Sequence, residues 1–222
     1  MNWEKQIDNL QKILIEIIDS KILPQDSYLA GGTALYFYLN HRVSFDIDFF
    51  SQKPFRPDAL IFEAREKFDR VDVEILEKDS LILFLSREKI KFSLFHLPYP
   101  LLSNLNFREL KSNLDCPIAS LEDLEAMKAL ALAQRGSAKD FVDLFYLLKR
   151  TCHSFKDMFS FVQRKYQVEK KYSYHLKTAM VYFFDAEQEV DDILIVDNSG
   201  KIRKITHEHW KEIKRFFTGF CQ

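Results

Sequence analysis

The chain has 222 residues, of which 47% are hydrophobic, so it can form one large domain or two small ones around a sizeable core. A formal net charge of -1 excludes an overall basic surface of the kind that coats DNA, although it leaves room for a local basic patch. Three widely spaced cysteines form neither a metal-ligand spacing nor a disulfide framework, and the first 20 residues lack a signal-peptide pattern. Since there is no apolar run of about 20 residues, we expect no membrane partner and a cytoplasmic location.

The first half of the chain mixes predicted helices and strands. Apolar residues at helical spacing open it, and a short apolar strand then runs into Gly31 and Gly32, after which Thr33 begins a short helix. Later runs of β-branched and aromatic residues are separated by polar breaks short enough for antiparallel hairpins. The predicted elements are a helix over 3–20, a strand over 28–30, a helix over 33–41, a strand over 44–50, a helix over 58–68, and strands over 71–77, 81–86 and 90–97.

The second half is predicted to be helical. Ser120, with acidic residues just after it, is typical of a helix start, and Gly136 interrupts the pattern. Residues 193–196 and 201–205 form either a small hairpin or an ordered loop. We therefore expect an α+β fold with one domain over residues 1–117 and a helical domain over residues 118–222. The further predicted helices cover residues 138–149, 155–166, 172–188 and 206–217.

Asp46 and Asp48 form the central chemical feature of the sequence. Residues i and i+2 of a strand point to the same face, so the two carboxylates converge on one side of the sheet. Two like charges are unfavourable there unless a cation or a proton neutralises them. A hard cation such as Mg²⁺ accepts one or two carboxylates together with phosphate oxygens. The alternative interpretation of this common pattern is a solvated polar strand face.

A glycine turn precedes the carboxylate pair by about a dozen residues. Gly31 and Gly32 allow close backbone approach, and the helix that Thr33 opens presents free N–H groups suited to phosphate. Taken alone, such a turn is also compatible with a purely structural strand-to-helix connection. Arg42 and Ser44 lie just before the strand, and Arg42 either binds a phosphate oxygen or forms a surface ion pair.

The order of these motifs resembles a known family. The segment GGTALYFYLNHRVSFDIDFFS resembles the signature of DNA polymerase β-like nucleotidyltransferases, and more closely that of the AbiEii/AbiGii toxin family. The segments YPLL and LEDLEAMKALALAQRGSAKDFVDLFYLL match later motifs of the same family, so the resemblance spans about residues 28–150. It implies a polymerase β-like nucleotidyltransferase core, with a mixed sheet and flanking helices, followed by a C-terminal helical domain.

The resemblance also implies roles for individual residues. Gly32 and Thr33 would hold the triphosphate, Asp46 and Asp48 would ligate Mg²⁺ or Mn²⁺, Lys128 would contact phosphate or nucleotide, and Lys139 with Asp140 would complete the site. Together with the glycine turn and the residues before the strand, the predicted nucleotide-binding set is Gly31, Gly32, Thr33, Arg42, Ser44 and Lys139, and the predicted catalytic set is Asp46, Asp48, Lys128 and Asp140. From the residues alone, Lys128 is also compatible with a solvated site on an alanine-rich helix. Asp140 and Asp143 share a helix face and are compatible with surface pairing to Lys139 or Arg135. For Asp143, a buried hydrogen-bond acceptor is a further interpretation.

The sequence departs from the family pattern at the expected third carboxylate. The strand before the proline step carries Ser93 where the family often has an acid, and serine does not act as a carboxylate base at neutral pH. Glu74 or Asp72 on an earlier strand are possible substitutes, and His96 is either a base or a polar residue at the strand end.

The predicted function is metal-dependent transfer of a nucleoside monophosphate from a nucleoside triphosphate to a hydroxyl of RNA (tRNA) or protein. The family implies a toxin of a toxin–antitoxin or phage-defence system, with a cognate antitoxin as partner. The alternatives are a degenerate member that binds nucleotide or RNA without transfer, an interaction protein, and γ-phosphate transfer. Cations and aromatic residues alternate over residues 150–177, which suits either RNA or a solvated basic face.

Overall fold

The structure is a computed structural model that describes residues 3–110, 113–197 and 199–222. The chain divides into two compact units, which we describe separately. The sheet unit comprises Met1–Ala34, Ser44–Pro100 and Asn104–Ala119, and the helical unit comprises Leu35–Val43, Leu101–Ser103 and Ser120–Gln222. The predicted α+β class is confirmed, and the domain boundary at residue 117 stays a prediction.

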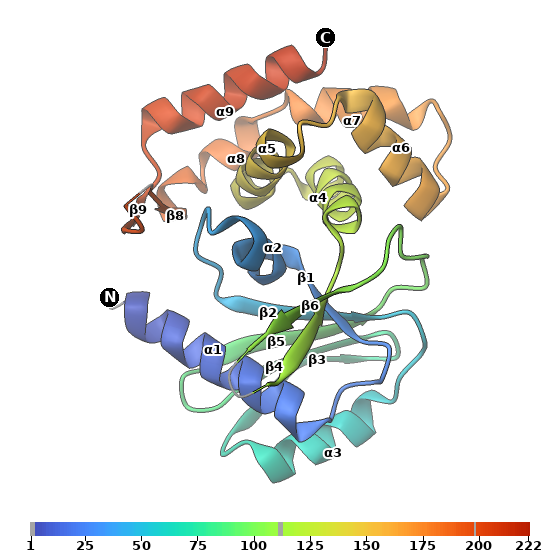
Figure 1. Ribbon diagram of the computed structural model, residues 1–222, viewed down its shortest axis with the longest axis vertical. Coiled ribbons are helices and arrows are strands. Elements are labelled where there is room, and N and C mark those ends of the chain that lie inside the picture. The colour runs from blue at the N-terminus through green and yellow to red at the C-terminus, as the bar shows by residue number, and fades with distance from the viewer. Residues whose placement is uncertain (1–2, 111–112, 198) are drawn as a thin grey trace. The chain divides into compact units, whose positions relative to one another are not determined.

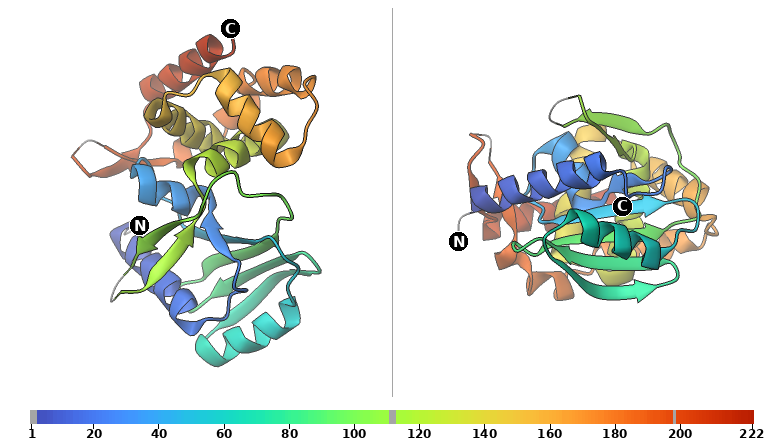
Figure 2. Two further views of the ribbon diagram at one scale, coloured as in Figure 1. Left: turned by 45° about the vertical axis from the view of Figure 1, so that its right-hand side comes forward. Right: turned by 90° about the horizontal axis from the view of Figure 1, so that it is seen from below.

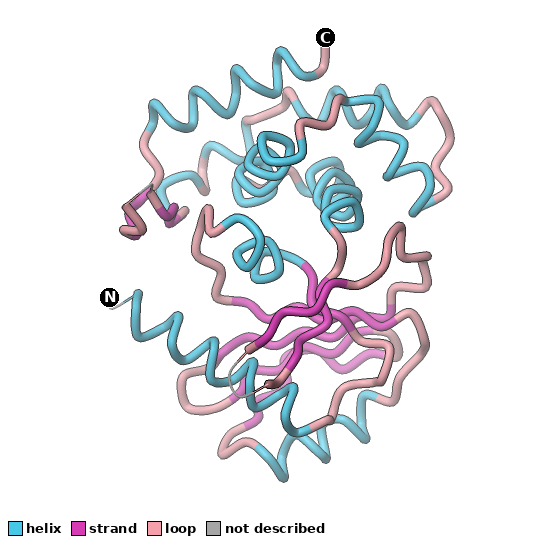
Figure 3. The backbone as a smooth tube through the Cα atoms, viewed as in Figure 1, coloured by secondary structure: helices cyan, strands magenta, loops and turns pink. Residues whose placement is uncertain are grey.

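The sheet unit is built on a seven-stranded mixed sheet, whose strands Figure 3 shows in magenta. The strand order is β3-β4-β5-β2-β1-β7-β6. The hairpin strands β3, β4 and β5 pair antiparallel as predicted, whereas β2 is parallel to β5 and antiparallel to β1, and β1 is parallel to β7. The strands are β1 (Tyr28–Ala30), β2 (Asp46–Ser51), β3 (Val71–Glu77), β4 (Ser80–Leu85), β5 (Ile90–His96), β6 (Asn106–Glu109) and β7 (Asp115–Ile118).

Two helices cover one face of this sheet. Figure 2 shows α1 (Trp3–Ser20) and α3 (Pro57–Lys67) in front of the strands in its right-hand view. Helix α1 contacts β2 and β5, and the Trp3 ring stacks on Phe45 with 6.0 Å between centroids. Ile47 and Phe49 follow Phe45 at intervals of two and are fully buried, so they lie on the helix-covered face. Asp46 and Asp48, which alternate with these three residues, therefore lie on the opposite face of the sheet.

The helical unit packs around α4 and α5, which Figure 1 shows end-on. Helix α4 contacts α5, α6 and α7, while α5 contacts α8 and α9. The rings of Phe141, Trp210 and Phe217 pack edge to face in its core. The elements are α4 (Leu121–Arg135), α5 (Ala138–Thr151), α6 (Phe155–Tyr166), α7 (Tyr172–Met180), α8 (Phe184–Glu187), a 3-10 turn (Val190–Asp192), the hairpin β8 (Leu194–Val196) and β9 (Ile202–Lys204), and α9 (His207–Phe220).

Local signals explain where several helices begin and end. The Ser120 side chain accepts a hydrogen bond from the Asp123 N–H, and Gly136 ends α4 in the left-handed conformation, both as predicted. The helix predicted over 172–188 is instead two helices, because the chain turns at 181–183. There Phe183 packs against Phe141 at 5.1 Å and Trp210 at 6.2 Å between ring centroids. In the described part of the chain, we find no helix long and apolar enough to cross a membrane.

Candidate active site

The glycine turn lies directly against the carboxylate strand. Helix α2 (Gly31–Leu39) begins at Gly31 rather than at the predicted Thr33, because strand β1 passes into the helix without a loop. Gly31 has φ +69°, a conformation that L side chains rarely adopt, and a Cβ at this position would lie 2.8 Å from Asp48 Oδ2. A side chain at residue 31 would therefore strain the backbone and displace the Asp48 carboxylate.

Asp46 and Asp48 are both half-buried on one face of β2. In the antiparallel pair of β1 and β2, Ala30 of β1 lies opposite Asp48 of β2. The Thr33 hydroxyl donates a hydrogen bond to the main-chain carbonyl of Asp46, and Thr33 is almost completely buried. Thr33 thus fastens the first turn of α2 to the start of β2, and so fixes the spacing between the helix N-terminus and the carboxylates.

The register of the neighbouring strand identifies the position of the third acid. In the parallel pair of β2 and β5, Asp48 lies beside Ser93 and Asp46 lies beside Lys91. Side chains of directly paired residues share a face, so Ser93 stands next to Asp48 where the family pattern expects a carboxylate. Ser93 is 1% exposed. The Lys91 ammonium lies 4.0 Å from Glu74 Oε2.

The three substitutes for the missing acid lie elsewhere. Asp72 is on β3, three strands from β2 in the sheet order, which is roughly 14 Å at the usual strand spacing. Glu74 lies on the same strand and pairs with Lys91. His96 is three residues from Ser93 and so points to the opposite face, where its Nδ1 is 3.2 Å from Asp79 Oδ1. None of the three takes the place of an acid at Ser93.

The residues at this site fit a hard divalent cation. Asp46 and Asp48 offer carboxylate oxygens on one strand face, and Gly31 keeps side-chain atoms away from Asp48. Mg²⁺ commonly uses one or two carboxylates and completes its shell with water and phosphate oxygens. Across residues 3–110, 113–197 and 199–222, no group of three or more His, Cys, Asp or Glu side chains is arranged to hold a metal ion. Two carboxylates on one strand face are the protein ligands that such a metal uses when phosphate oxygens complete its shell.

A buried ionic cluster occupies the helical unit. Asp143 on α5 is fully buried and receives two hydrogen bonds from Arg42, Nε to Oδ1 at 2.6 Å and Nη2 to Oδ2 at 2.7 Å. His41 Nε2 also lies 2.7 Å from Asp143 Oδ1, and Arg42 Nη1 donates to the Val43 carbonyl at 3.0 Å. The Arg42 guanidinium thus forms a buried bidentate pair rather than the surface pair considered from the sequence, and its contact with a phosphate stays a prediction.

Lys128 joins Asp143 to a second buried carboxylate. Its ammonium lies 2.7 Å from Asp143 Oδ2 and 3.1 Å from Asp140 Oδ1. Arg135 then binds Asp140 through Nε at 2.7 Å and Nη2 at 2.9 Å. Three cations, Arg42, Lys128 and Arg135, therefore surround the two carboxylates, and the Arg135 side chain is 63% exposed.

The protonation states of the cluster follow from burial and charge. Burial raises the pKa of Asp143, but the charges of Arg42 and Lys128 outweigh it and hold that pKa well below its usual range. Burial lowers the pKa of Lys128, yet Asp143 and Asp140 outweigh burial and raise it. For His41 burial dominates, so its pKa falls below the usual 6.5 despite the hydrogen bond to Asp143. At neutral pH His41 is therefore uncharged.

The other site residues predicted from the sequence differ in environment. Lys139 is exposed in the first turn of α5, and Ser44 is half-buried before β2. The sequence interpretation missed His41, which pairs with a residue 102 positions away. The only sequence feature that pointed to His41 is its position directly before Arg42. Hydrophobic periodicity does not predict a contact between residues as distant in the chain as His41 and Asp143.

The basic and aromatic segment over residues 150–177 is not a uniform basic face. Lys165 is fully buried and lies 2.6 Å from Asp123 Oδ1, and Lys177 donates to the Cys221 carbonyl at 2.6 Å. Arg150, Lys156 and Lys170 are exposed. Some cations of this segment therefore hold the helices together.

Solved structures share this arrangement of elements, and two of the three described next are named as nucleotidyltransferases. A Helicobacter pylori protein, JHP933, superposes with a TM-score of 0.61 at 18% identity, covering 98% of this chain and 92% of that protein. A putative nucleotidyltransferase of H. pylori gives 0.58 at 18% identity, covering 99% and 93%. MenT4, a nucleotidyltransferase toxin of Mycobacterium tuberculosis, gives 0.56 at 12% identity, covering 100% and 85%. At these identities the likeness defines the fold class, an α+β nucleotidyltransferase fold.

The family follows from the sequence matches. An uncharacterized protein of Aquifex aeolicus is 37% identical over 216 residues, which cover 96% of this chain and 95% of that protein. The family model described as "Nucleotidyl transferase AbiEii toxin, Type IV TA system" matches residues 12–220. The chain belongs to the AbiEii nucleotidyltransferase toxin family.

Proposed function

We propose that this protein transfers a nucleoside monophosphate from a nucleoside triphosphate to a hydroxyl of RNA, tRNA above all, or of a protein. The observation that carries the proposal is the close approach of Gly31 to Asp48, with Asp46 two residues earlier on the same strand face. A glycine-bounded helix N-terminus beside two carboxylates suits a triphosphate and its divalent cation together.

The residues of the sheet unit bind and orient the triphosphate. Free N–H groups in the first turn of α2, which Gly31 and Gly32 open, donate to phosphate oxygens. Thr33 acts by fastening this turn to Asp46 through the main-chain carbonyl. Asp46 and Asp48 hold Mg²⁺ or Mn²⁺, which supplies positive charge where negative charge accumulates on the phosphates.

The proposed reaction is a balanced displacement at the α-phosphorus. The acceptor hydroxyl oxygen forms a bond to that phosphorus while the bond to the α–β bridging oxygen breaks, and pyrophosphate leaves. The hydroxyl proton passes to water, since Ser93 stands beside Asp48 in place of an acid. The result is a nucleoside monophosphate joined to the acceptor.

Lys128, Asp140 and Lys139 remain in the proposed catalytic and nucleotide-binding set through the family resemblance. Within the helical unit Lys128 pairs with Asp140 and Asp143, and Lys139 is exposed in the first turn of α5. We assign Arg42 a positioning role, because its guanidinium holds Asp143 and thereby Lys128. Ser44 stays a proposed nucleotide contact.

The family also supports a biological role. We propose that the protein acts as the toxin of a bacterial toxin–antitoxin or phage-defence pair, and that a cognate antitoxin protein is its partner. Growth arrest on induction, relieved by co-expression of the neighbouring gene, is the expected result. Growth arrest that persists in Asp46→Asn would separate toxicity from nucleotidyl transfer and contradict this role.

The experiment that tests the enzymatic proposal measures pyrophosphate release and transfer of an α-labelled nucleotide to total tRNA and to protein. Each nucleoside triphosphate is offered with Mg²⁺ or with Mn²⁺. Asp46→Asn and Asp48→Asn should reduce both readouts about 100-fold or more, since several kcal/mol of charge stabilisation is lost. The matched control, Asp58→Asn on the exposed surface of α3, should retain full activity. Activity that survives in Asp46→Asn would refute the site.

A second candidate function is favoured by one observation, the hydroxyl of Ser93 beside Asp48. A degenerate member would bind nucleotide or RNA without transferring it. Calorimetry in the presence of Mg²⁺ would then give nucleotide binding without pyrophosphate release, while a nucleoside diphosphate product would indicate γ-phosphate transfer. A chain that binds no nucleotide in this experiment is an interaction protein.

A further inference from the structure

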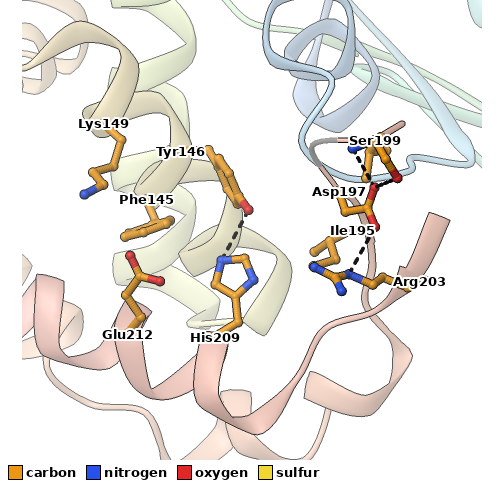
Figure 4. Close-up of a pocket in the computed structure, with 10 residues that line it drawn as sticks. Phe145, Tyr146, Lys149, Ile195, Asp197, Ser199, Arg203, His209 and Glu212 are labelled. Atoms are coloured by element: carbon orange, nitrogen blue, oxygen red, sulfur yellow. Dashed lines mark hydrogen bonds and ion pairs between the residues drawn. The ribbon is translucent and has the colours of Figure 1, made fainter. Parts of the chain in front are cut away.

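The helical unit contains a cavity of about 610 Å³ that the proposed catalytic set does not use (Figure 4). One wall comes from α5 and α9, and the other from the β8–β9 hairpin. Its volume lies within the roughly 300–1,000 Å³ typical of small-molecule sites. All of its lining residues belong to one compact unit, so the cavity is a property of that unit alone.

The first wall is aromatic. The rings of Phe145, Tyr146 and His209 stand nearly perpendicular to one another, with centroid distances of 5.3 Å, 5.8 Å and 6.2 Å between the three pairs. Figure 4 shows the Tyr146 hydroxyl turned toward His209 Nε2, at 3.2 Å. Burial lowers the pKa of His209, which keeps its ring neutral near pH 7. A flat ring therefore meets both aromatic faces and hydrogen-bonding edges here.

Cations lie at two separate edges of the cavity. The Lys149 ammonium is 5.7 Å from the centroid of the Phe145 ring, and the Arg203 guanidinium lies on the hairpin wall. Arg203 is 58% exposed in its side chain and lies 3.7 Å from Asp197 Oδ2. The other Asp197 oxygen is occupied by the turn that follows it, where it accepts from Ser199. Both cations thus retain hydrogen-bonding capacity toward a ligand.

Glu212 adds an acceptor beneath the aromatic wall, where Figure 4 shows its carboxylate close to the Phe145 ring. A carboxylate accepts hydrogen bonds from exocyclic amino groups of bases. An aromatic wall, an acceptor for amino groups and two flanking cations match the parts of a nucleotide: a flat base with polar edges, and phosphates on either side.

The cavity is also joined to the buried ionic cluster. The Tyr146 ring packs against the His41 ring at 5.2 Å between centroids, and His41 Nε2 is bound to Asp143. Helix α5 therefore presents Tyr146 to the cavity and Asp143 to the cluster. A ligand that orders Tyr146 acts on a side chain in direct contact with the cluster.

We propose that this cavity binds one unpaired nucleotide, with its base against Tyr146 and His209 and its phosphates at Lys149 and Arg203. The proposal deepens the proposed function, on which it rests for its biological meaning, because it assigns a docking site to a single-stranded nucleic-acid acceptor. The aromatic wall offers a stacking surface to an unpaired base, whose faces and edges are exposed, whereas the bases of a duplex are already stacked and paired. Free mononucleotides share this chemistry, and the experiment distinguishes the two sources.

The test measures binding of a labelled single-stranded oligoribonucleotide by fluorescence anisotropy, with EDTA and without nucleoside triphosphate. Lys149→Ala combined with Arg203→Ala should weaken binding about tenfold or more and lower the salt slope by about 1.4, the value for two lost phosphate contacts on a single strand. Arg150→Ala combined with Lys204→Ala is the matched control, since each is an exposed cation adjacent in sequence to a lining residue. The control should change affinity by less than about twofold. Equal affinities for the two double variants would overturn the proposal.

The base contact is tested by photocrosslinking and by a matched pair of histidines. An oligoribonucleotide carrying 5-iodouridine should crosslink to peptides containing Tyr146 or His209, and crosslinks confined to other peptides would overturn the proposal. His209→Ala should weaken binding about 5- to 100-fold, the range for one lost stacked base, while His207→Ala, exposed at the start of α9, should not. Competition by adenosine or cytidine monophosphate would identify a free nucleotide as a ligand, and binding by oligonucleotide alone would identify RNA.

The outcome is independent of the catalytic assignment. The binding test contains no divalent cation, so loss of activity in Asp46→Asn does not affect it. If pyrophosphate release fails but the variant-sensitive binding holds, the proposed function falls and the nucleotide cavity stands. If release requires Asp46 but the two double variants bind alike, the cavity assignment falls alone.

Discussion

Two carboxylate pairs in this chain show opposite ways of placing like charges together. Asp46 and Asp48 are two residues apart on a strand and half-buried, while Asp140 and Asp143 are three residues apart on a helix and fully buried. The helical pair is neutralised by cations of the chain itself, with Lys128 bridging both carboxylates. The strand pair lies against the glycine that begins helix α2. Loss of one partner from the compensated helical pair should therefore destabilise the fold, whereas the strand pair beside a helix N-terminus suits a cation together with phosphate.

The largest expected effect on the fold comes from breaking the compensated pair. Asp143→Asn should lower the free energy of unfolding by about 3–5 kcal/mol, because it leaves the charge of Arg42 buried without its partner. Asp46→Asn should change that free energy by less than about 0.5 kcal/mol, since no buried pair is lost. Urea denaturation followed by circular dichroism measures both. Equal destabilisation by the two variants would contradict the distinction between the pairs.

Alanine substitutions at Gly31 and Gly200 separate the steric effect on Asp48 from the effect of backbone strain. Gly31→Ala should lose activity about 100-fold and some 1–2 kcal/mol of stability, because the methyl group meets Asp48 at 2.8 Å and φ is +69°. Gly200→Ala is the matched control, with φ +79° and nothing within 4 Å of the added Cβ. The control should lose a similar amount of stability and keep its activity. Activity is measured by pyrophosphate release and stability by thermal denaturation. A Gly31→Ala variant that keeps full activity would show that the close approach of Gly31 to Asp48 is not needed for the reaction.

Acid should destabilise the cluster through two groups that act in the same direction. The pKa of His41 is below 6.5 in the folded state, so the unfolded chain takes up a proton first as pH falls through 6.5, and stability present above that pH is lost. The depressed pKa of Asp143 continues the loss at lower pH, below its ordinary value of 3.8. Denaturant midpoints between pH 8 and pH 5 should therefore fall, and His41→Asn should flatten the part of the curve near pH 6. A midpoint that rises on acidification would contradict the neutral state of His41.

The smallest expected effect tests whether Ser93 faces the cation that Asp46 and Asp48 are proposed to bind. Ser93→Asp places a third carboxylate beside Asp48, so Mg²⁺ should raise its melting temperature by several degrees more than that of the unmodified protein. Ser93→Asn has nearly the same shape without the charge and should not respond in this way. Pyrophosphate release is expected to rise by up to about tenfold in Ser93→Asp alone, for a gain near 1.4 kcal/mol. An identical response of the two variants to Mg²⁺ would show that residue 93 does not face the cation.

Features that depend on local pattern were predictable from the sequence. Alternation along β2 predicted the shared face of Asp46 and Asp48, and the polar breaks predicted the antiparallel hairpins of β3, β4 and β5. The family pattern predicted that Ser93 takes the position of an acid, and the strand register puts it beside Asp48. In each instance the information lies within a few residues or in an ordered set of motifs.

Features that depend on distant pairing were not predictable. Strands β6 and β7 were missed because each is only four residues long: β6 is exposed throughout, and the alternation of β7 covers only two buried residues with a proline between them. The pair of Arg42 and Asp143 joins residues 101 positions apart, and a lone charged residue before a strand does not indicate its partner. The helix predicted over 172–188 fails for a related reason, because aromatic packing of Phe183 determines where the chain turns.

The close approach of Gly31 to Asp48 has a consequence for how this chain tolerates sequence variation. Every missense change of a glycine codon introduces a side chain, and any side chain at Gly31 projects a Cβ toward the Asp48 carboxylate. In a growth selection against the proposed toxicity, escape mutants should therefore accumulate at the Gly31 codon as readily as at the codon of Asp46. The mutational fragility of the site extends to a residue that has no functional group.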